Sequence, residues 1–185
     1  MRLKASVIFF AAFASVSCLY GESRRASVMS ESKADVVEQA KIAMLCMQKR
    51  SWEVGTAMHA LIELGDEKSL VVMARDAILQ SAPDGRLAMI GSEKNIADTG
   101  VNGPGMLAAY KITGDEKFMK AARAQYDFLM LPSSRNSKGT IYHNTERPVI
   151  FSDNMFMVAP FIAQMGDYDD CLLYTSDAAD DVSTV

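Results

Sequence analysis

A short motif that recurs at nearly constant spacing constrains the fold of this 185-residue chain most strongly. Gly65-Asp66-Glu67-Lys68 returns as Gly114-Asp115-Glu116-Lys117 and, more weakly, as Gly166-Asp167-Tyr168-Asp169, at intervals of 49 and 52 residues. Glycine ends helices because it adopts the left-handed conformation easily, and an aspartate after it can cap the next helix. Each copy therefore predicts a tight turn between two helices.

Apolar runs with helical character flank these motifs. Three of them precede a motif (Ala57–Leu64, Met106–Ile112 and Met155–Met165), and two follow one (Leu70–Leu79 and Phe118–Leu129). A period near fifty residues is typical of stacked or toroidal helical hairpins, which bury their apolar faces against their neighbours. The sequence therefore predicts an all-α fold.

The composition of the helices predicts which of them lie inside, and the length of the connections predicts where a functional site lies. Val36–Leu45 and Phe118–Leu129 mix apolar with charged residues, as outer helices do, whereas Met155–Met165 is almost wholly apolar and predicts an inner helix. The connections over 81–103 and 131–152 are long, which is uncommon without a function. The second includes a candidate short strand, Gly139–His143. We expect both connections to emerge at the same rim.

Both ends of the chain differ from a globular domain. Residues 1–21 have the charged start, apolar centre and small-residue end of a signal peptide, which predicts export to the periplasm or outside the cell. Cys18 allows a lipoprotein alternative, which the serine at position 15 disfavours. Residues 171–185 resemble a translated sequencing adapter, so we expect a non-native tail there. A linker over 22–35 and a partial catalytic domain over 36–170 complete the predicted organisation.

Charge and cysteine content exclude several classes of function. The formal net charge is −4 and no basic cluster is present, which argues against a nucleic-acid partner. Of the three cysteines, Cys18 and Cys171 fall in the two atypical ends, and Cys46 lies in an apolar helical run. No disulfide framework or metal site can be built from these residues, and Cys46 is predicted to be a small core residue. No cofactor and no membrane span are predicted.

Asp153 is the acid that most strongly indicates a function. It lies in the apolar segment Ile150–Phe161, where a helix is predicted to begin. An ionised carboxylate among apolar neighbours is costly unless it is hydrogen-bonded or used in catalysis. Asp153 is therefore either a helix cap or a catalytic acid.

Two other residues occupy comparable places before a Gly-Asp motif. Trp52, Asp98 and Asp153 precede their motifs by 13, 16 and 13 residues, at or just before the start of an inner helix. Equivalent positions in successive hairpins would face one central pocket, where the positive ends of helices also gather. Two acids and an indole around one cavity are a composition that suits a carbohydrate.

Several strings of this sequence together resemble glycoside hydrolase families 88 and 105, the unsaturated glucuronyl and rhamnogalacturonyl hydrolases. The strings that carry the resemblance, in order, are Ser51–Gly55, Asp84–Ala88, Ile96–Gly103, Leu107–Asp115, Ile141–His143 and Phe151–Phe161. The resemblance implies an (α/α)6 toroid, of which about the first half would be present. It departs at Phe151, where a tryptophan is common in the family.

The resemblance also implies a reaction and a set of site residues. An acid in the place of Asp153 would protonate C4 of a terminal 4,5-unsaturated uronic acid and then activate water, and Asp98 would assist. Trp52, His143 and Asn102 would contact the oligosaccharide. Trp52 could equally be a core anchor, His143 a structural histidine and Asn102 the start of a helix, while His59 is expected to pack in the interior.

Two functions outside this hydrolase class remain open at this point. A helical-repeat scaffold without catalytic activity would explain the repeat and the export signal, but not the acids that precede the inner helices. The second is a related α-toroid, either an epimerase or a sugar-binding protein without catalytic activity. The polysaccharide and the oligomeric state do not follow from the sequence.

Overall fold

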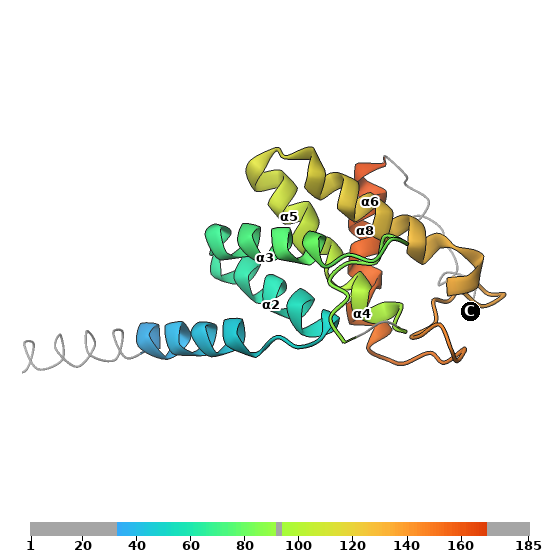
Figure 1. Cartoon of the computed structure of the whole chain (residues 1–185), viewed down its shortest axis with the longest axis horizontal. Helices are drawn as coiled ribbons and strands as arrows, with labels where there is room; N and C mark the ends of the chain where they lie inside the picture. Colours follow the sequence, from blue (N-terminus) through green and yellow to red (C-terminus); the bar gives the residue numbers. More distant parts are fainter. Residues whose placement is uncertain (1–32, 92–93, 170–185) are drawn as a thin grey trace, which may run out of the picture. The chain divides into compact units, whose positions relative to one another are not determined.

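The first two Gly-Asp motifs form tight turns between consecutive helices in the computed structural model, which describes residues 33–91 and 94–169 (Figure 1). Helix α2 (Ser51–Leu64) ends at Gly65 with φ +66°, and Asp66 caps α3 (Glu67–Leu79) by accepting from the Ser69 N–H. Helix α5 (Gly103–Thr113) ends likewise at Gly114, also at φ +66°, and Asp115 caps α6 (Glu116–Met130). These two predicted helical hairpins are confirmed.

The third copy of the motif does not form such a turn, so the prediction of a turn at Gly166 is wrong. Helix α8 (Ala159–Tyr168) continues through Gly166 and ends at Asp169. The predicted single helix over Met155–Met165 is also wrong, because it is interrupted at Val158 and leaves a short helix α7 (Asn154–Met157). Pro160 has no N–H to continue a helical ladder, which accounts for the interruption.

One unit of the chain begins at Gln48. Its core lies between the two hairpins and α8. Helix α8 packs on α5 and α6, and its Phe161 is completely buried beside the ring of Tyr126. At the far end of α8, the guanidinium of Arg123 donates to the Asp169 carboxylate and lowers the pKa of that carboxyl. Hence α6 holds α8 at two places along its length.

The two long connections lie against each other at one end of the hairpins, as expected. The first contains α4 (Ala97–Gly100) and the second a 3-10 turn (Pro132–Ser134). Backbone hydrogen bonds join them, with Ile96 N–H donating to His143 O at 2.8 Å and Thr145 N–H to Lys94 O at 2.7 Å. In Figure 1 the two tight turns lie toward the left and α4 lies toward the right.

The short strand predicted over Gly139–His143 does not form. In the described part of the chain there are only isolated bridges, which pair Arg135 with Ile141 and Asn95 with Asn144. The partners of this segment are loop residues, so no neighbouring strand is available to extend a ladder.

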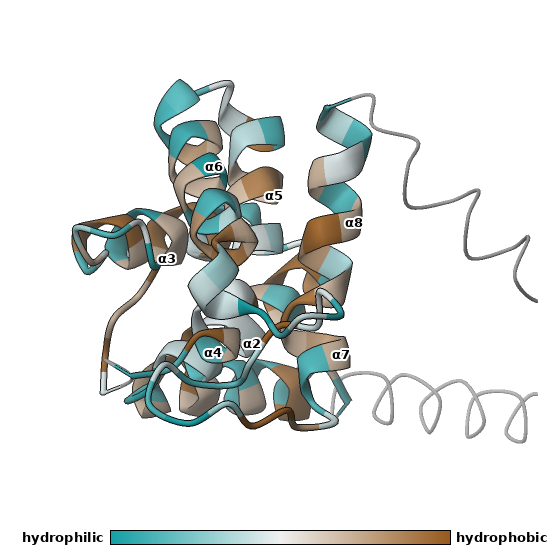
Figure 2. Cartoon of the chain, turned by 90° about the vertical axis from the view of Figure 1, so that its right-hand side faces the viewer, coloured by the Kyte–Doolittle hydropathy of each residue, from teal (hydrophilic) through white to brown (hydrophobic). Residues whose placement is uncertain are grey.

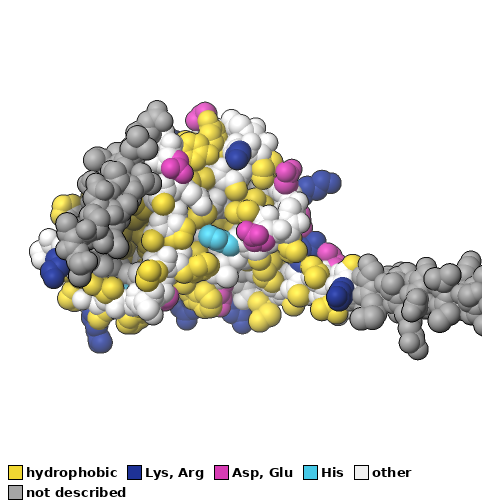
Figure 3. Space-filling view, turned by 180° about the vertical axis from the view of Figure 1, so that it is seen from behind, with side chains coloured by type: hydrophobic (Ala, Val, Ile, Leu, Met, Phe, Trp, Pro, Cys, Tyr) yellow, Lys and Arg dark blue, Asp and Glu magenta, His cyan; other side chains and the backbone are white. Residues whose placement is uncertain are grey.

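Helix α7 is less buried than predicted. Met155 is 78% exposed and Phe156 is 45% exposed, although the run was expected to pack on several sides. Figure 2 shows α7 and α8 along one side of the unit, and Figure 3 shows hydrophobic side chains spread over the face seen from behind.

A separate helix covers residues 33–47, which belong to a different unit from Gln48 and the described residues after it. It includes the predicted helix Val36–Leu45, and a Lys41–Glu38 ion pair of 2.8 Å lies on its surface. Cys46 is exposed, so its predicted place in a core is wrong. The proposed signal peptide, most of the linker and the tail over 171–185 lie outside the described residues. In the ranges 33–91 and 94–169, no helix is long and apolar enough to cross a membrane.

The left-handed turn at Gly114 leads to a stability prediction. A Cβ there would meet open space, so only the backbone conformation opposes a side chain. We expect Gly114→Ala to lower the free energy of unfolding by about 1 kcal/mol. Gly114→Asn should lower it less, because asparagine tolerates this conformation. Urea unfolding of both variants tests this, and equal stability of Gly114→Ala and the native chain would contradict it.

Candidate active site

Asp98 is held at the base of the hairpins by the short helix α4. The residue is 5% exposed, and its carboxylate Oδ2 accepts from the side-chain amide of Asn95. Its backbone carbonyl accepts from Ser51 Oγ at 3.2 Å, and Ser51 lies at the buried start of α2. Asp98 is therefore held at two places, its carboxylate by its own loop and its backbone by the first hairpin.

His143 lies next to Asp98 because its backbone bonds to the loop that carries α4. Its carbonyl accepts from the Ile96 N–H, and its own N–H donates to Val149 O at 2.7 Å. The ring is packed against Phe151, with the ring centres 4.4 Å apart. Its Nε2 lies 3.7 Å from Asp98 Oδ1, which is farther than a hydrogen bond.

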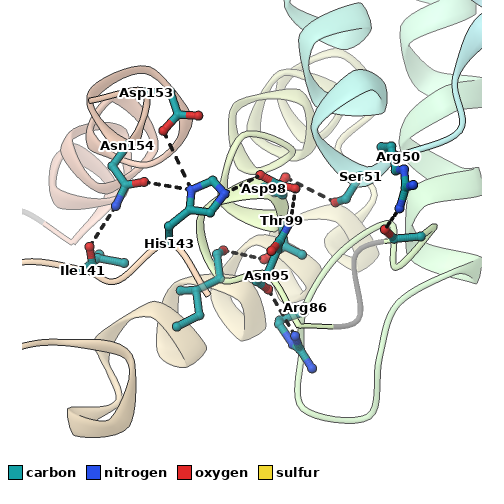
Figure 4. Close-up of polar contacts among 12 residues, drawn as sticks. Arg50, Ser51, Arg86, Asn95, Asp98, Thr99, Ile141, His143, Asp153 and Asn154 are labelled. Carbon is teal, nitrogen blue, oxygen red and sulfur yellow. Dashed lines mark hydrogen bonds and ion pairs between the residues drawn. The ribbon is translucent and has the colours of Figure 1, made fainter. Parts of the chain in front are cut away.

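Asp153 reaches the same imidazole from the other side, as Figure 4 shows. Its Oδ1 lies 3.7 Å from His143 Nδ1, and its side chain is 46% exposed. Asp153 precedes α7 but makes no capping hydrogen bond with its side chain. The capping interpretation is therefore wrong in this structure. Its carboxylate is accessible to a ligand.

Two asparagines that the sequence reasoning did not select bind this cluster. Asn154 follows Asp153, and its Oδ1 lies 3.3 Å from His143 Nδ1 while its Nδ2 donates to Ile141 O at 2.8 Å. Asn95 binds the Asp98 carboxylate and accepts at its own carbonyl from Arg86 Nη1, at 3.1 Å. The motif spacing gives no signal for either residue. Asn154 and Arg86 do lie in the strings that carry the family resemblance.

Asn102 and Trp52 differ in their relation to the cluster: the Asn102 amide donates to the backbone carbonyl of Asp98 at 3.4 Å, whereas Trp52 lies at the surface. Asn102 is completely buried, and its amide donates to Ser51 O and Ser51 Oγ at 3.2 and 3.1 Å. It links the start of α5 to α2, and its predicted contact with the oligosaccharide stays a prediction. Trp52 is 40% exposed, which contradicts a core anchor, but no hydrogen bond or ring contact joins its side chain to the two acids in the described ranges.

An open pocket of about 280 Å³ adjoins the cluster through Phe151 and Asn154. Its other walls come from the second long loop and from α7 and α8, and Arg135 is the one cationic side chain among its described lining residues. Within 33–91 and 94–169, no group of three His, Cys, Asp or Glu residues is placed to hold a metal ion. Asp98, Asp153 and His143 are not among the residues that line this pocket, and of these three only the side chain of Asp153 is exposed.

His59 packs as predicted, and its position leads to a pH prediction. Its ring contacts Phe156 of α7, with the centres 5.4 Å apart, and burial lowers its pKa below 6.5. The folded state therefore binds fewer protons than the unfolded chain. Stability is fully present above about pH 6.5 and is lost as the pH falls toward the lowered pKa.

We expect the native chain to lose more stability than the His59→Leu variant between pH 7.5 and pH 5.5. Thermal unfolding at both values measures this difference. The carboxyl of Asp169, whose lowered pKa falls below this range, contributes equally in both chains. An identical loss in the two chains would show that His59 is not responsible.

The fold and this cluster define a class of protein: an all-α hairpin protein in which two aspartates flank one imidazole, an arrangement suited to acid–base catalysis. The family model described as Glycosyl Hydrolase Family 88 matches residues 26–184, and the chain belongs to that family. Its members have the (α/α)6 toroid fold, so the predicted family and fold class are confirmed.

The family assignment makes this protein a glycoside hydrolase that acts on carbohydrate. No curated protein and no solved structure matches the chain. The matched range includes residues 171–184, of which the structure describes nothing, so the expectation of a non-native tail stays a prediction.

Proposed function

We propose that this protein hydrolyses oligosaccharides that end in a 4,5-unsaturated uronic acid, by adding water across the C4=C5 bond. The observation that carries the proposal is the placement of Asp153 and Asp98, each 3.7 Å from a different nitrogen of His143. Asp153 is accessible and makes no capping hydrogen bond, whereas Asp98 is buried and anchored. One acid can thus meet the substrate while the other is held behind the imidazole.

The proposed reaction needs one acid that gives a proton and later takes one back. Protonated Asp153 would transfer its proton to C4, which leaves positive charge shared between C5 and the ring oxygen. The Asp153 carboxylate would then take a proton from water as the water oxygen bonds to C5. The resulting hemiketal opens to a 5-ketone, and the hemiacetal left at C1 releases the neighbouring sugar. This reaction protonates the double bond and not the glycosidic oxygen, unlike ordinary glycoside hydrolysis.

Asp98 and His143 would support this chemistry electrostatically. Charge that develops on the sugar ring in the transition state is stabilised best by groups that are already oriented. The Asp98 carboxylate is oriented by Asn95, and the imidazole by its packing on Phe151. Neither group has to reorganise when the substrate binds.

The test is to express the full reading frame and follow the ultraviolet absorbance of an unsaturated uronyl disaccharide, which falls as the C4=C5 bond is lost. The matched saturated disaccharide is the control, since an ordinary glycosidase would cleave it without needing the double bond. We expect the absorbance to fall and the saturated compound to remain intact. A folded protein that leaves the absorbance unchanged would refute the proposed substrate.

We also propose that the protein is exported, on the basis of the signal-like composition of residues 1–21. N-terminal sequencing of the mature protein from a host with a secretion pathway tests this. Cleavage near residue 21 would support export of a free protein, and a lipid-modified Cys18 at the new N-terminus would support the lipoprotein alternative. An uncleaved N-terminus in the cytoplasm would refute both.

A further inference from the structure

Arg86 binds the loop that carries Asp98. Its guanidinium Nη1 donates to the backbone carbonyl of Asn95 at 3.1 Å, and the side-chain amide of Asn95 donates to the Asp98 carboxylate. Figure 4 shows Asn95 between Arg86 and Asp98. Asn95 thus holds the carboxylate with its side chain, while Arg86 holds the backbone of Asn95.

The peptide group between Asn95 and Ile96 is bonded at both ends. Its N–H donates to the carbonyl of His143 in the second long loop at 2.8 Å, and its carbonyl accepts from Arg86. The N–H and the carbonyl of a planar trans peptide point in opposite directions. Bonds at the two ends therefore fix the tilt of this plane, and they fix with it the Cα from which the Asn95 amide extends.

Arg86 is itself held firmly where it meets Asn95. Its Nε donates to Asp84 Oδ2 at 3.0 Å, and its Nη2 lies 2.9 Å from the same oxygen. The guanidinium lies over the ring of Phe128 on α6, 5.0 Å from the ring centre, and the side chain is only 12% exposed. A guanidinium has donors on several sides of one rigid plane, so it can bind a carboxylate and a carbonyl at the same time.

The contact between the two long loops does not depend on Arg86. The carbonyls of His143 and Lys94 each accept two hydrogen bonds across it, from residues other than Arg86. Loss of the guanidinium should therefore leave the loops together, while the peptide after Asn95 is held at one end only. The consequence falls on the Asn95 amide and, through it, on the Asp98 carboxylate.

We propose that Arg86 is a positioning residue that holds the backbone of Asn95 so that the Asn95 amide stays bonded to the Asp98 carboxylate. Arg86 acts through Asn95 and not on the substrate. Its importance for catalysis rests on the proposed function, because that function gives Asp98 its electrostatic role. The orientation of the Asn95 amide does not rest on it and can be measured separately.

The orientation of this amide can be followed by NMR of the full chain without any substrate. Side-chain amides give proton–nitrogen signals, and the pair that is absent from Asn95→Ala belongs to Asn95. Arg86→Met should move this pair toward the position of a solvated amide. Arg86→Lys keeps a positive charge beside Asp84 but cannot bind Asp84 and the Asn95 carbonyl together, so it should cause the same shift. It takes the place of Arg86→Met if that variant does not fold.

A kinetic double-mutant cycle tests whether Arg86 acts through the Asn95 amide. Arg86→Met should lower kcat on the unsaturated disaccharide by up to roughly a hundredfold, with a smaller change in KM, as for a displaced catalytic group. Asn95→Ala removes the amide but keeps the carbonyl that Arg86 binds, and it should lower kcat similarly. The double variant should stay within roughly twofold of Asn95→Ala, because both substitutions break the same connection.

Arg123→Met is the matched control. Arg123 also pairs with an aspartate, Asp169, and lies over an aromatic ring of α6, that of Tyr126, but it lies at the far end of α8. Its loss should leave the Asn95 signal and kcat unchanged.

An Asn95 signal that keeps its position in the folded Arg86 variants would overturn the proposal. Losses of kcat that multiply in the double variant would overturn it as well, since Arg86 would then act by another route. The expected signals in a native chain without activity on the unsaturated disaccharide would instead refute the proposed function alone. Circular dichroism of each variant confirms that the chain is folded before the spectra are compared.

Discussion

Asp153→Asn should lower kcat on an unsaturated uronyl disaccharide by roughly 10²–10⁴-fold, which is the range for loss of a general acid. The amide keeps the size of the side chain but cannot give its proton to C4 or take one from water. The side chain is 46% exposed and makes no capping bond, so the fold does not depend on its charge. The free energy of unfolding should change by less than about 0.5 kcal/mol. Absorbance kinetics and urea unfolding measure the two effects.

The capping and catalytic interpretations of Asp153 are separated by a second substitution. Asp153→Ala would cost about 1 kcal/mol if the carboxylate capped α7, because alanine cannot accept from the free N–H groups. We expect no such loss. Asp167→Asn is the matched control, since this exposed acid lies on α8 away from the imidazole and should leave kcat unchanged. Substantial activity in Asp153→Asn would remove Asp153 from its proposed role.

The helical hairpins could be predicted because local chemistry decides them. A glycine in the left-handed conformation and an aspartate that caps the next helix are sufficient at Gly65 and Gly114. At Gly166 the same two residues do not end the helix, and α8 continues through Tyr168. Just after this point Asp169 pairs with Arg123 of α6. A tertiary contact decides that boundary, and the motif alone does not contain it.

The acids of the site could be predicted from their positions, but their environments could not. Asp98 and Asp153 were selected together and lie at the same imidazole, yet one is buried and the other is exposed. The difference arises because Asp98 lies in a loop packed under the first hairpin, whereas Asp153 lies at the open edge of α7. The partners of His143 depend on bonds between two loops about fifty residues apart, such as Ile96 N–H to His143 O.

The contact between α5 and α8 fixes the distance between the two loops that carry these acids, and we expect it to be sensitive to a single methyl group. A Cβ at Gly103 would lie closer than 3.0 Å to the ring of Phe161, which is completely buried. We expect Gly103→Ala to lower the free energy of unfolding by about 3 kcal/mol, since a filled core cannot accept the added atom without a shift. Phe161→Ala should lower it by about 4 kcal/mol through the cavity that it leaves.

These two losses should not add, because the cavity left by Phe161→Ala has room for the methyl group of Gly103→Ala. The double variant should therefore be more stable than the sum predicts, by about 1–3 kcal/mol. Gly105→Ala is the matched control, as its Cβ would meet Met58 and not Phe161, so its effect should add to that of Phe161→Ala. Urea unfolding of the complete cycle measures the coupling. Additive losses for Gly103→Ala and Phe161→Ala would mean that α8 moves away from α5 instead of packing against it. In that case Asp153 would not be held at a fixed distance from Asp98.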